Sequence, residues 1–376
     1  MRRILSFSLT LLCLFSGCSK EDTPSPIFPD RTILVFMAGE NSLSGFTESN
    51  LKSIISGANV SNIEKCNLLI YIDNYKQTSL YKIEKNETGV VDAVLKKTYN
   101  NEDNSADIST MRNIITDVFS TYPADEKGLF LWSHGTAWLP ADLDSYLRSF
   151  GQDGDKKMEI TELREALPEG FDFIIFDACY MSSVEVVYEL RNKAKYILGS
   201  STEIMGEGFP YSLVIPELLS DKPMEDRLVN TANTFYNHYN AQTGYNRTGN
   251  ISLIKTSELS KLAASCRSIL AGRYVQSEMI DPSPFGLKLQ ALEYLTTSIN
   301  YSFLYDLEDY LSVFDAHIEL DAVVFKATTP YSYFDKPRRS IAINKYCGLS
   351  IYVPQVRNPK MNDWYTRLEW YKDVYN

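Results

Sequence analysis

The sequence predicts an α/β fold, with a mostly parallel central sheet flanked by helices. Its 376 residues are 44% hydrophobic and 23% charged, a composition typical of a folded chain with a sizeable core. Several short apolar runs are continuous rather than alternating, as expected for strands that are covered on both faces of a sheet. Helical patterns separate these runs, and strands that alternate with helices indicate a layered α/β sandwich.

The predicted strands and helices follow one another along the chain. The continuous apolar runs that predict strands of the sheet lie at residues 32–39, 67–73, 128–135, 171–179 and 195–201. Helical patterns cover residues 105–122, 158–167, 224–240 and 303–314, and further strands are predicted at residues 249–256 and 348–354. In the helix at 158–167 we expect Thr161 to be the N-cap, although Arg164 stands where the capping pattern prefers an acid.

The N-terminus has the pattern of a secretory signal peptide over residues 1–17. Two arginines precede an apolar stretch, Ile4–Phe15, that is too short to span a membrane. The small residues directly before Cys18 resemble a bacterial lipobox, so we expect Cys18 to be lipidated and to become the first mature residue. An ordinary signal peptide that is cut near Gly17 is the alternative.

Residues 18–30 predict a flexible, proline-rich tether. A lysine followed by two acidic residues just after Cys18 looks like the surface-export signal of Bacteroidetes lipoproteins. We therefore expect an exported protein that is lipid-anchored to the bacterial outer membrane and faces the periplasm or the outside. Behind the tether we expect a core at residues 31–222 and a C-terminal part at 223–376 that completes the sheet and adds helices.

The chain is acidic. Its formal net charge is −11, and removal of residues 1–17 takes away two arginines, which lowers the charge to −13. This charge disfavours nucleic acid as a partner and favours a cationic substrate.

The cysteines indicate neither a zinc site nor a dense disulfide framework. Beyond the signal peptide and Cys18, four widely separated cysteines remain, at positions 66, 179, 266 and 347. No Cys-x-x-Cys or Cys/His cluster is present, so zinc is disfavoured. Cys66 and Cys347 each stand at the start of an apolar strand and are predicted to be buried thiols. One or two disulfides stay open as an alternative.

One histidine and one cysteine stand where chemistry is expected. His238 and His317 lie in helical patterns and are expected to be structural, whereas His134 follows an apolar strand and precedes a glycine. Cys179 alone is more typical of a core residue, but a thiolate nucleophile needs an imidazole to take its proton. Asp177 stands two residues before Cys179, on the same side of an extended strand, and is therefore predicted to line the same pocket.

Several segments resemble the clostripain-like cysteine peptidases, which have a caspase-like fold. They are FMAGENSL, FLWSHGTAW, FDFIIFDACYMSSVEVVYEL, STEIMGEGFPY, YDLEDYL and GLSIYVP. The resemblance covers nearly all of the mature chain, and it implies a three-layer caspase-like sandwich that cleaves peptide bonds after arginine or lysine.

The resemblance also implies roles for single residues. His134 matches the catalytic base and Cys179 the nucleophile, and the backbone N–H groups of Gly135 and Cys179 would bind the oxyanion. Asp177 matches the acidic residue of the S1 pocket. Glu207 stands where the family often has aspartate, so its longer side chain leaves the preference between arginine and lysine open.

The family activates itself by cutting a loop between its histidine and its cysteine. Here the loop covers residues 136–157 and offers Arg148, Lys156 and Lys157, among which the bond between Arg148 and Ser149 resembles the processed segment most closely. The chemistry requires no metal or other cofactor. Ca²⁺ is implied for some family members only, and the acidic stretch at residues 153–159 lacks the full spacing of a calcium loop.

A non-enzymatic surface lipoprotein that binds peptides or glycans is the alternative function. It would explain the tether and the 25 tyrosines, but not the pairing of a strand-end histidine with a cysteine and an acid. A degenerate, inactive peptidase is a weaker alternative, because both catalytic residue types are present.

Overall fold

The structure is a computed structural model that describes residues 29–140, 150–273, 289–293, 302–333 and 340–376. The predicted signal peptide, the predicted lipidation site Cys18 and the predicted cut between Arg148 and Ser149 lie outside the described residues.

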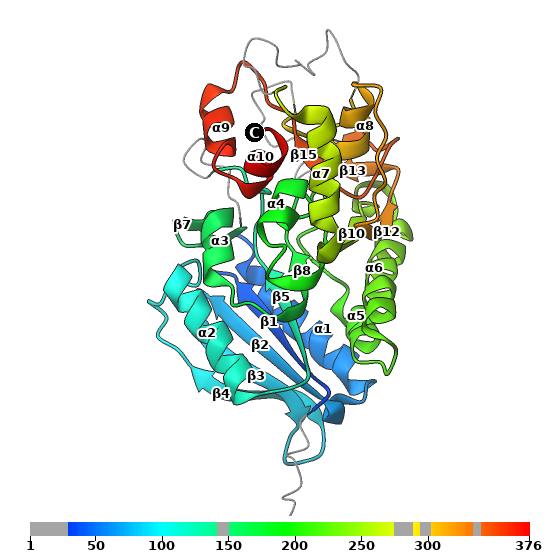
Figure 1. Cartoon of the computed structure of the whole chain (residues 1–376). Coiled ribbons are helices and arrows are strands. Elements are labelled where there is room, and N and C mark those ends of the chain that lie inside the picture. The colour runs from blue at the N-terminus through cyan, green and yellow to red at the C-terminus, as the bar shows by residue number, and fades with distance from the viewer. Residues whose placement is uncertain (1–28, 141–149, 274–288, 294–301, 334–339) are drawn as a thin grey trace, which may run out of the picture.

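A nine-stranded sheet organises the described residues (Figure 1). In chain order its strands are β1 (Arg31–Ala38), β2 (Cys66–Asn74), β3 (Gln77–Lys85), β4 (Val91–Thr98), β5 (Glu126–Trp132), β8 (Phe171–Asp177), β9 (Ala194–Gly199), β10 (Asn250–Lys255) and β12 (Val323–Thr328). Their spatial order is β12-β10-β9-β8-β5-β1-β2-β3-β4. The central strands from β9 to β2 are parallel, and the outer strands on both sides pair antiparallel.

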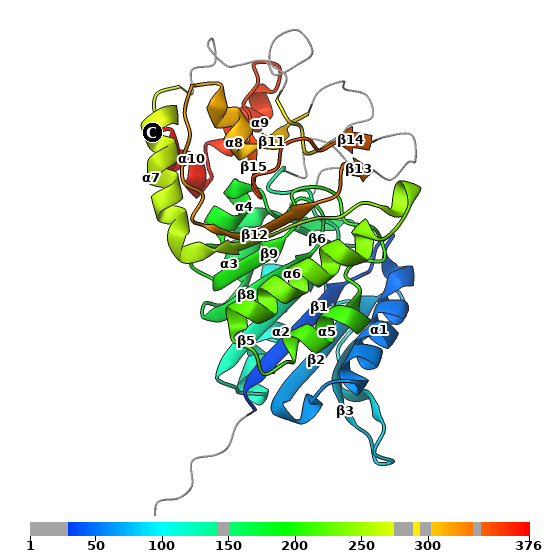
Figure 2. The same ribbon diagram turned by 90° about the vertical axis from the view of Figure 1, so that its right-hand side faces the viewer.

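Helices cover both faces of this sheet, as the continuous apolar strands predict (Figures 1 and 2). One face carries α1 (Thr47–Asn59), α5 (Tyr211–Leu218) and α6 (Met224–Asn240), and the other carries α2 (Ile108–Thr121), α3 (Ile160–Ala166), α4 (Val184–Glu189) and α7 (Leu259–Leu270). Successive residues of β1 point to opposite faces, so Ile33 and Leu34 belong to different buried cores. The predicted three-layer α/β sandwich is confirmed.

The last third of the chain packs onto the segment that follows β8. β15 (Ser350–Tyr352) pairs with β11 (Leu304–Asp306), and its Ser350 N–H donates to the Ser182 carbonyl at 3.1 Å. The remaining described elements are β6 (Phe150–Asp153), β7 (Lys156–Met158), β13 (Tyr331–Tyr333), β14 (Ser340–Ala342), α8 (Leu307–Ser312), α9 (Pro359–Tyr365) and α10 (Glu369–Val374).

Two local predictions were wrong. Glu159, not Thr161, is the N-cap of α3, because the Glu159 and Glu162 carboxylates each accept the other residue's backbone N–H in a capping box. His317 lies outside any helix, because α8 already ends at Ser312.

Among the described residues Cys66, Cys179, Cys266 and Cys347 are free thiols, so the disulfides left open by the sequence do not form between them.

Candidate active site

Loops from four parallel strands meet where the strand order reverses. The chain passes from β1 to β2 in one direction across the sheet, and from β5 to β8 and β9 in the other. Loops at the carboxyl ends of the strands diverge at such a switch point and leave room for a ligand. Segments 39–43, 133–135, 178–180 and 200–208 follow β1, β5, β8 and β9 at this point.

His134 lies directly after β5 and is half-buried. Its Nε2 atom is 2.8 Å from Oγ of Ser42. Its backbone carbonyl accepts a hydrogen bond of 3.0 Å from the Gly151 N–H, and the preceding Ser133 hydroxyl donates to the Ala38 carbonyl at 2.8 Å. The imidazole is therefore placed by a backbone that both β1 and β6 hold.

Gly135 brings the histidine turn against the segment of Cys179. A Cβ atom at position 135 would lie 2.6 Å from the Cys179 carbonyl oxygen and 3.2 Å from the Ala178 side chain. Only glycine permits so close an approach of the two backbones. The structure thus brings together the two segments for which the sequence predicts a base and a nucleophile.

Cys179 does not continue the strand that precedes it. The predicted strand reached Cys179, but β8 ends at Asp177, and Tyr180 adopts a left-handed φ of 65° in the turn that follows. The expected alternation of Asp177 and Cys179 along one strand therefore does not apply. The thiol Sγ atom instead lies 3.3 Å from the Ile204 amide nitrogen, which donates to it.

The surroundings of the Cys179 thiol favour its protonated form. Cys179 is half-buried, and burial, together with the negative charge of Glu203, raises its pKa above the ordinary range. A protonated thiol is a weak nucleophile, so attack by this sulfur would need a base that takes its proton.

Asp177 ends β8 with a buried carboxylate. Its Oδ2 atom accepts hydrogen bonds from the Phe209 N–H at 3.0 Å and from the Tyr211 hydroxyl at 2.7 Å. Its Oδ1 atom receives no hydrogen bond from the described residues. Burial raises the pKa of Asp177 to about 6, although the two donors oppose that shift.

Glu207 differs from Asp177 in its exposure. It lies in the turn from Met205 to Gly208 and is exposed, whereas Asp177 is only 4% exposed. Its charge also acts on His238. Burial lowers the pKa of His238, and the negative charge of Glu207 opposes that shift. His238 therefore lies close enough to Glu207, one of the two predicted specificity residues, to feel its charge.

A buried pair of carboxyl groups stands beside these loops. Asp73, at the end of β2, accepts a hydrogen bond from Thr78, and the Ser105 hydroxyl bonds to its other oxygen. Burial and the neighbouring Asp73 raise the pKa of Asp153 to about 7. Within the ranges that the structure describes, no group of three or more His, Cys, Asp or Glu side chains is placed to hold a metal ion.

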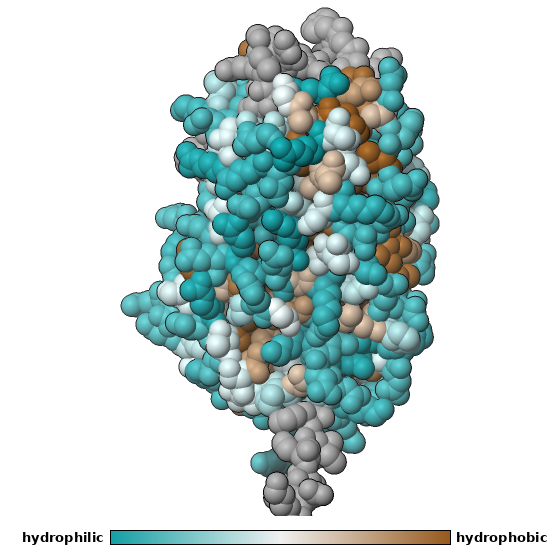
Figure 3. All heavy atoms as spheres, in the orientation of Figure 1, coloured by the Kyte–Doolittle hydropathy of each residue, from teal (hydrophilic) through white to brown (hydrophobic). Residues whose placement is uncertain are grey.

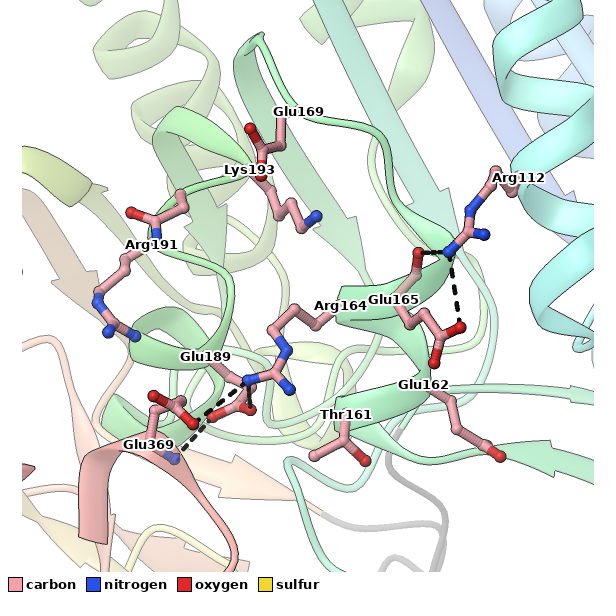
Figure 4. A pocket seen from close by; sticks show the side chains of 11 residues that line it. Arg112, Thr161, Glu162, Arg164, Glu165, Glu169, Glu189, Arg191, Lys193 and Glu369 are labelled. Carbon is pink, nitrogen blue, oxygen red and sulfur yellow. Dashed lines mark hydrogen bonds and ion pairs between the residues drawn. The ribbon is translucent and has the colours of Figure 1, made fainter. Parts of the chain in front are cut away.

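A separate depression of about 570 Å³ carries a dense network of charges (Figure 4). Arg164 pairs with Glu189 and Glu369, and Arg112 pairs with Glu165. Neither a cysteine nor a histidine lines it, and its Glu169 and Lys193 precede β8 and β9. The depression thus lies at the amino ends of the strands, opposite the loops of His134 and Cys179.

The outer surface seen in Figure 3 is mostly hydrophilic, with apolar side chains in scattered patches. Among the helices that the structure describes, none has the length and apolarity that a membrane span requires.

Solved structures of the same architecture are cysteine proteases. An inactive zymogen C11 protease from Parabacteroides distasonis is 41% identical, with a TM-score of 0.80, and the match covers 94% of this chain and 100% of that one. A secreted C11 cysteine protease from Bacteroides thetaiotaomicron, solved with an irreversible peptide inhibitor, is 33% identical, with a TM-score of 0.76 and coverage of 92% and 99%. The fold and the site define the class of caspase-like cysteine peptidases.

The clostripain family model matches residues 35–376, so the chain belongs to the clostripain family, as the sequence resemblance predicts. Clostripain of Hathewaya histolytica is 25% identical over 221 residues, which are 50% of this chain and 42% of that protein. The matched region thus spans less than half the length of this curated relative.

Sequence reasoning missed three residues that shape the site. Ser42, Gly208 and Tyr211 contact His134 or Asp177, yet none was singled out. All three lie in segments that carry the family resemblance. Their place in those segments is the signal that could have drawn attention to them.

Proposed function

We propose that this chain is a cysteine endopeptidase that cleaves peptide bonds after arginine, with lysine as a second accepted residue. The observation that carries the proposal is the close packing of the His134 turn against Cys179, at the switch point of a fold shared with cysteine proteases. The negative charge of the chain supports a cationic substrate.

The dyad performs acyl transfer in two steps. The His134 imidazole takes the thiol proton while the Cys179 sulfur attacks the carbonyl carbon of the substrate, and the carbonyl oxygen becomes an oxyanion. The N–H groups of Gly135 and Cys179 are the proposed donors to that oxyanion. The imidazolium then gives its proton to the leaving amine, which leaves a thioester. In the second step His134 takes a proton from water while the water oxygen attacks the thioester carbon. The carbon–sulfur bond then breaks, which releases the carboxylic acid, and the imidazolium returns the proton to the sulfur.

Specificity is assigned to two carboxylates with different roles. Oδ2 of Asp177 accepts two hydrogen bonds, whereas Oδ1 receives none from the described residues, and we assign Oδ1 to the cationic side chain of the substrate. A guanidinium presents paired N–H donors that suit such a carboxylate. Exposed Glu207 would contribute its charge at the mouth of the pocket.

Self-activation is proposed to occur after Arg148. Support comes from the chain just downstream, because Phe150 begins β6 and forms a bridge with Gly135, next to His134. Arg148→Ala should prevent the appearance of a new N-terminus at Ser149, while Lys156→Ala and Lys157→Ala should not. Unchanged processing in Arg148→Ala would show that the cut lies elsewhere.

Anchoring is proposed to occur through a lipid on Cys18, with removal of residues 1–17 and placement at the outer membrane. The B. thetaiotaomicron protease above is described as secreted, which supports export of this chain. Cys18→Ser should move the protein from the membrane fraction to the soluble fraction. An unaltered membrane location would reject the lipid anchor.

The proposed chemistry needs no cofactor, so a chelator should leave cleavage of an arginyl peptide unchanged. A large loss in EDTA that Ca²⁺ restores would contradict this point.

The central test is labelling with a peptide that carries arginine and a thiol-reactive group. The label should modify Cys179 in the unmutated protein and nothing in Cys179→Ala, and unlabelled arginyl peptide should compete. A surface protein that only binds peptides or glycans would take up no covalent label at Cys179.

A further inference from the structure

Ser42 contacts the side chain that is proposed to act as the base. Its hydroxyl oxygen lies 2.8 Å from Nε2 of His134, and this is the only hydrogen bond of the Ser42 side chain among the described residues. Ser42 follows β1 and is exposed, so this contact does not arise from core packing.

The backbone around Ser42 is held in place from several sides. The Asn41 amide group donates to the Ala38 carbonyl at 3.0 Å and to the Gln152 carbonyl at 2.8 Å, and its oxygen accepts the Leu43 N–H at 2.8 Å. Glu40 adds a link to the hairpin of β6, because its carbonyl accepts the Gly154 N–H at 2.9 Å. Ser42 therefore stands on a segment that is fixed to both β1 and β6.

The hydrogen bond has a chemical consequence for the imidazole. A neutral imidazole carries one N–H and one lone pair, and a partner at one nitrogen decides which nitrogen is the base. When Nε2 carries the proton and donates to the Ser42 oxygen, the lone pair is on Nδ1. After proton transfer both nitrogens carry hydrogen, and the Ser42 oxygen still accepts from Nε2.

We propose that Ser42 is a positioning residue that holds His134 in the tautomer with its proton on Nε2, so that Nδ1 takes the thiol proton of Cys179. This inference rests on the proposed function, because it assumes that His134 is the base. Ser42 itself touches neither the substrate nor the sulfur in this role.

The test compares Ser42→Ala with Ser42→Thr and with the control Ser44→Ala. Ser44 lies two residues further on the same segment, and its hydroxyl makes no hydrogen bond with any residue that the structure describes. All variants are assayed after N-terminal sequencing has shown that processing is complete. Loss of a neutral hydrogen bond predicts a fall in kcat of ~3–10-fold in Ser42→Ala, with KM nearly unchanged. Ser42→Thr should recover most of the loss, and Ser44→Ala should match the unmutated enzyme.

Alkylation of Cys179 by iodoacetamide gives a second readout that needs no substrate binding. Near pH 7 the thiol depends on His134, so Ser42→Ala should react more slowly by a similar factor. As the pH rises, hydroxide deprotonates a growing share of the thiol directly, and the difference between the rates of the two proteins should narrow. A uniform slowing at every pH would indicate a structural defect and would overturn the positioning role.

Failure of this inference and failure of the proposed function give different results. If Cys179→Ala and His134→Ala retain activity, the proposed function fails. If both are inactive while Ser42→Ala behaves like Ser44→Ala, the dyad stands and the role of Ser42 is rejected.

Discussion

Gly208 covers the carboxylate of Asp177 so closely that a Cβ atom at position 208 would lie 2.4 Å from Oδ2 of Asp177. Gly208 also has a left-handed φ of 72°, and the next residue, Phe209, donates its N–H to the same oxygen. The backbone at Gly208 therefore forms a wall directly against this carboxylate.

Gly208→Ala should disturb this wall and lower kcat/KM for an arginyl substrate by at least ~10-fold, because the new methyl group displaces the Asp177 carboxylate. Gly244→Ala is the matched control, since Gly244 has a left-handed φ of 56° but no atom within 4 Å of the added Cβ. Thermal unfolding of both variants separates backbone strain from the effect on the pocket. Equal kcat/KM values in the two variants would show that the close approach of Gly208 to Asp177 does not affect cleavage of the arginyl substrate.

Asp177→Asn should reduce kcat/KM for an arginyl substrate by roughly one to three powers of ten, because a charge-assisted bond to the guanidinium is lost. Citrulline serves as the neutral isostere of arginine in a matched substrate. Glu207→Gln should reduce kcat/KM less, because its longer exposed side chain loses more entropy when it is fixed. If the unmutated enzyme cuts after citrulline as well as after arginine, the assignment of Asp177 and Glu207 to an acidic specificity pocket is wrong.

Asp177→Asn should also stabilise the fold at neutral pH. Burial raises the native pKa of Asp177 to about 6, above its value in an unfolded chain, so ionisation favours the unfolded state. This cost is absent at acidic pH, grows as the pH rises towards about 6, and is constant above that value. Asp177→Asn should therefore raise Tm at pH 8 and leave it nearly unchanged at pH 4. A lower Tm at pH 8 would mean that the two hydrogen bonds to the carboxylate outweigh its desolvation.

Selectivity for arginine should depend on pH. Protonation of Asp177 removes the charge that attracts a guanidinium, so the ratio of kcat/KM for arginine over citrulline should fall as the pH drops through about 6. The ratio cancels the titration of His134 and Cys179, which both substrates share. A ratio that stays constant between pH 5 and pH 8 would contradict the assignment of Asp177.

Cys179→Ala and His134→Ala should each abolish peptide cleavage and self-cleavage while the fold remains intact. The two residues act as a unit, so the double variant should be no worse than either single one. His238→Gln and His317→Gln are the controls and should retain nearly full turnover. A large loss in either control would mean that the wrong histidine was chosen.

The parallel centre of the sheet could be predicted from the sequence, whereas its edges could not. β1, β2, β5, β8 and β9 are buried on both faces and appear as continuous apolar runs. β4 is largely exposed, and its polar residues give no such run, so the antiparallel hairpin of β3 and β4 was missed. An edge strand gains its order from its partner, which a local pattern does not reveal.

The site residues that could be predicted are those with reactive or charged side chains. His134, Cys179 and Asp177 were found from residue type and from their position after a strand. Ser42 and Gly208 were not, because a serine and a glycine are common in loops and gain meaning only from the residue they contact. That contact joins segments 92 residues apart for Ser42 and His134, a distance over which no sequence periodicity acts.

A cut after Arg148 would divide the central sheet between two polypeptides. β5 would belong to the first and β8 to the second, although they pair along Gly128–Trp132 and Phe173–Asp177. The hydrogen bonds of β6 to His134 and Asn41 would also cross that division. Each piece alone would leave apolar strand residues exposed to water. The nicked enzyme should therefore elute as one particle under native conditions and separate only in denaturant. Its specific activity should consequently survive dilution, as that of a loosely associated pair of subunits would not.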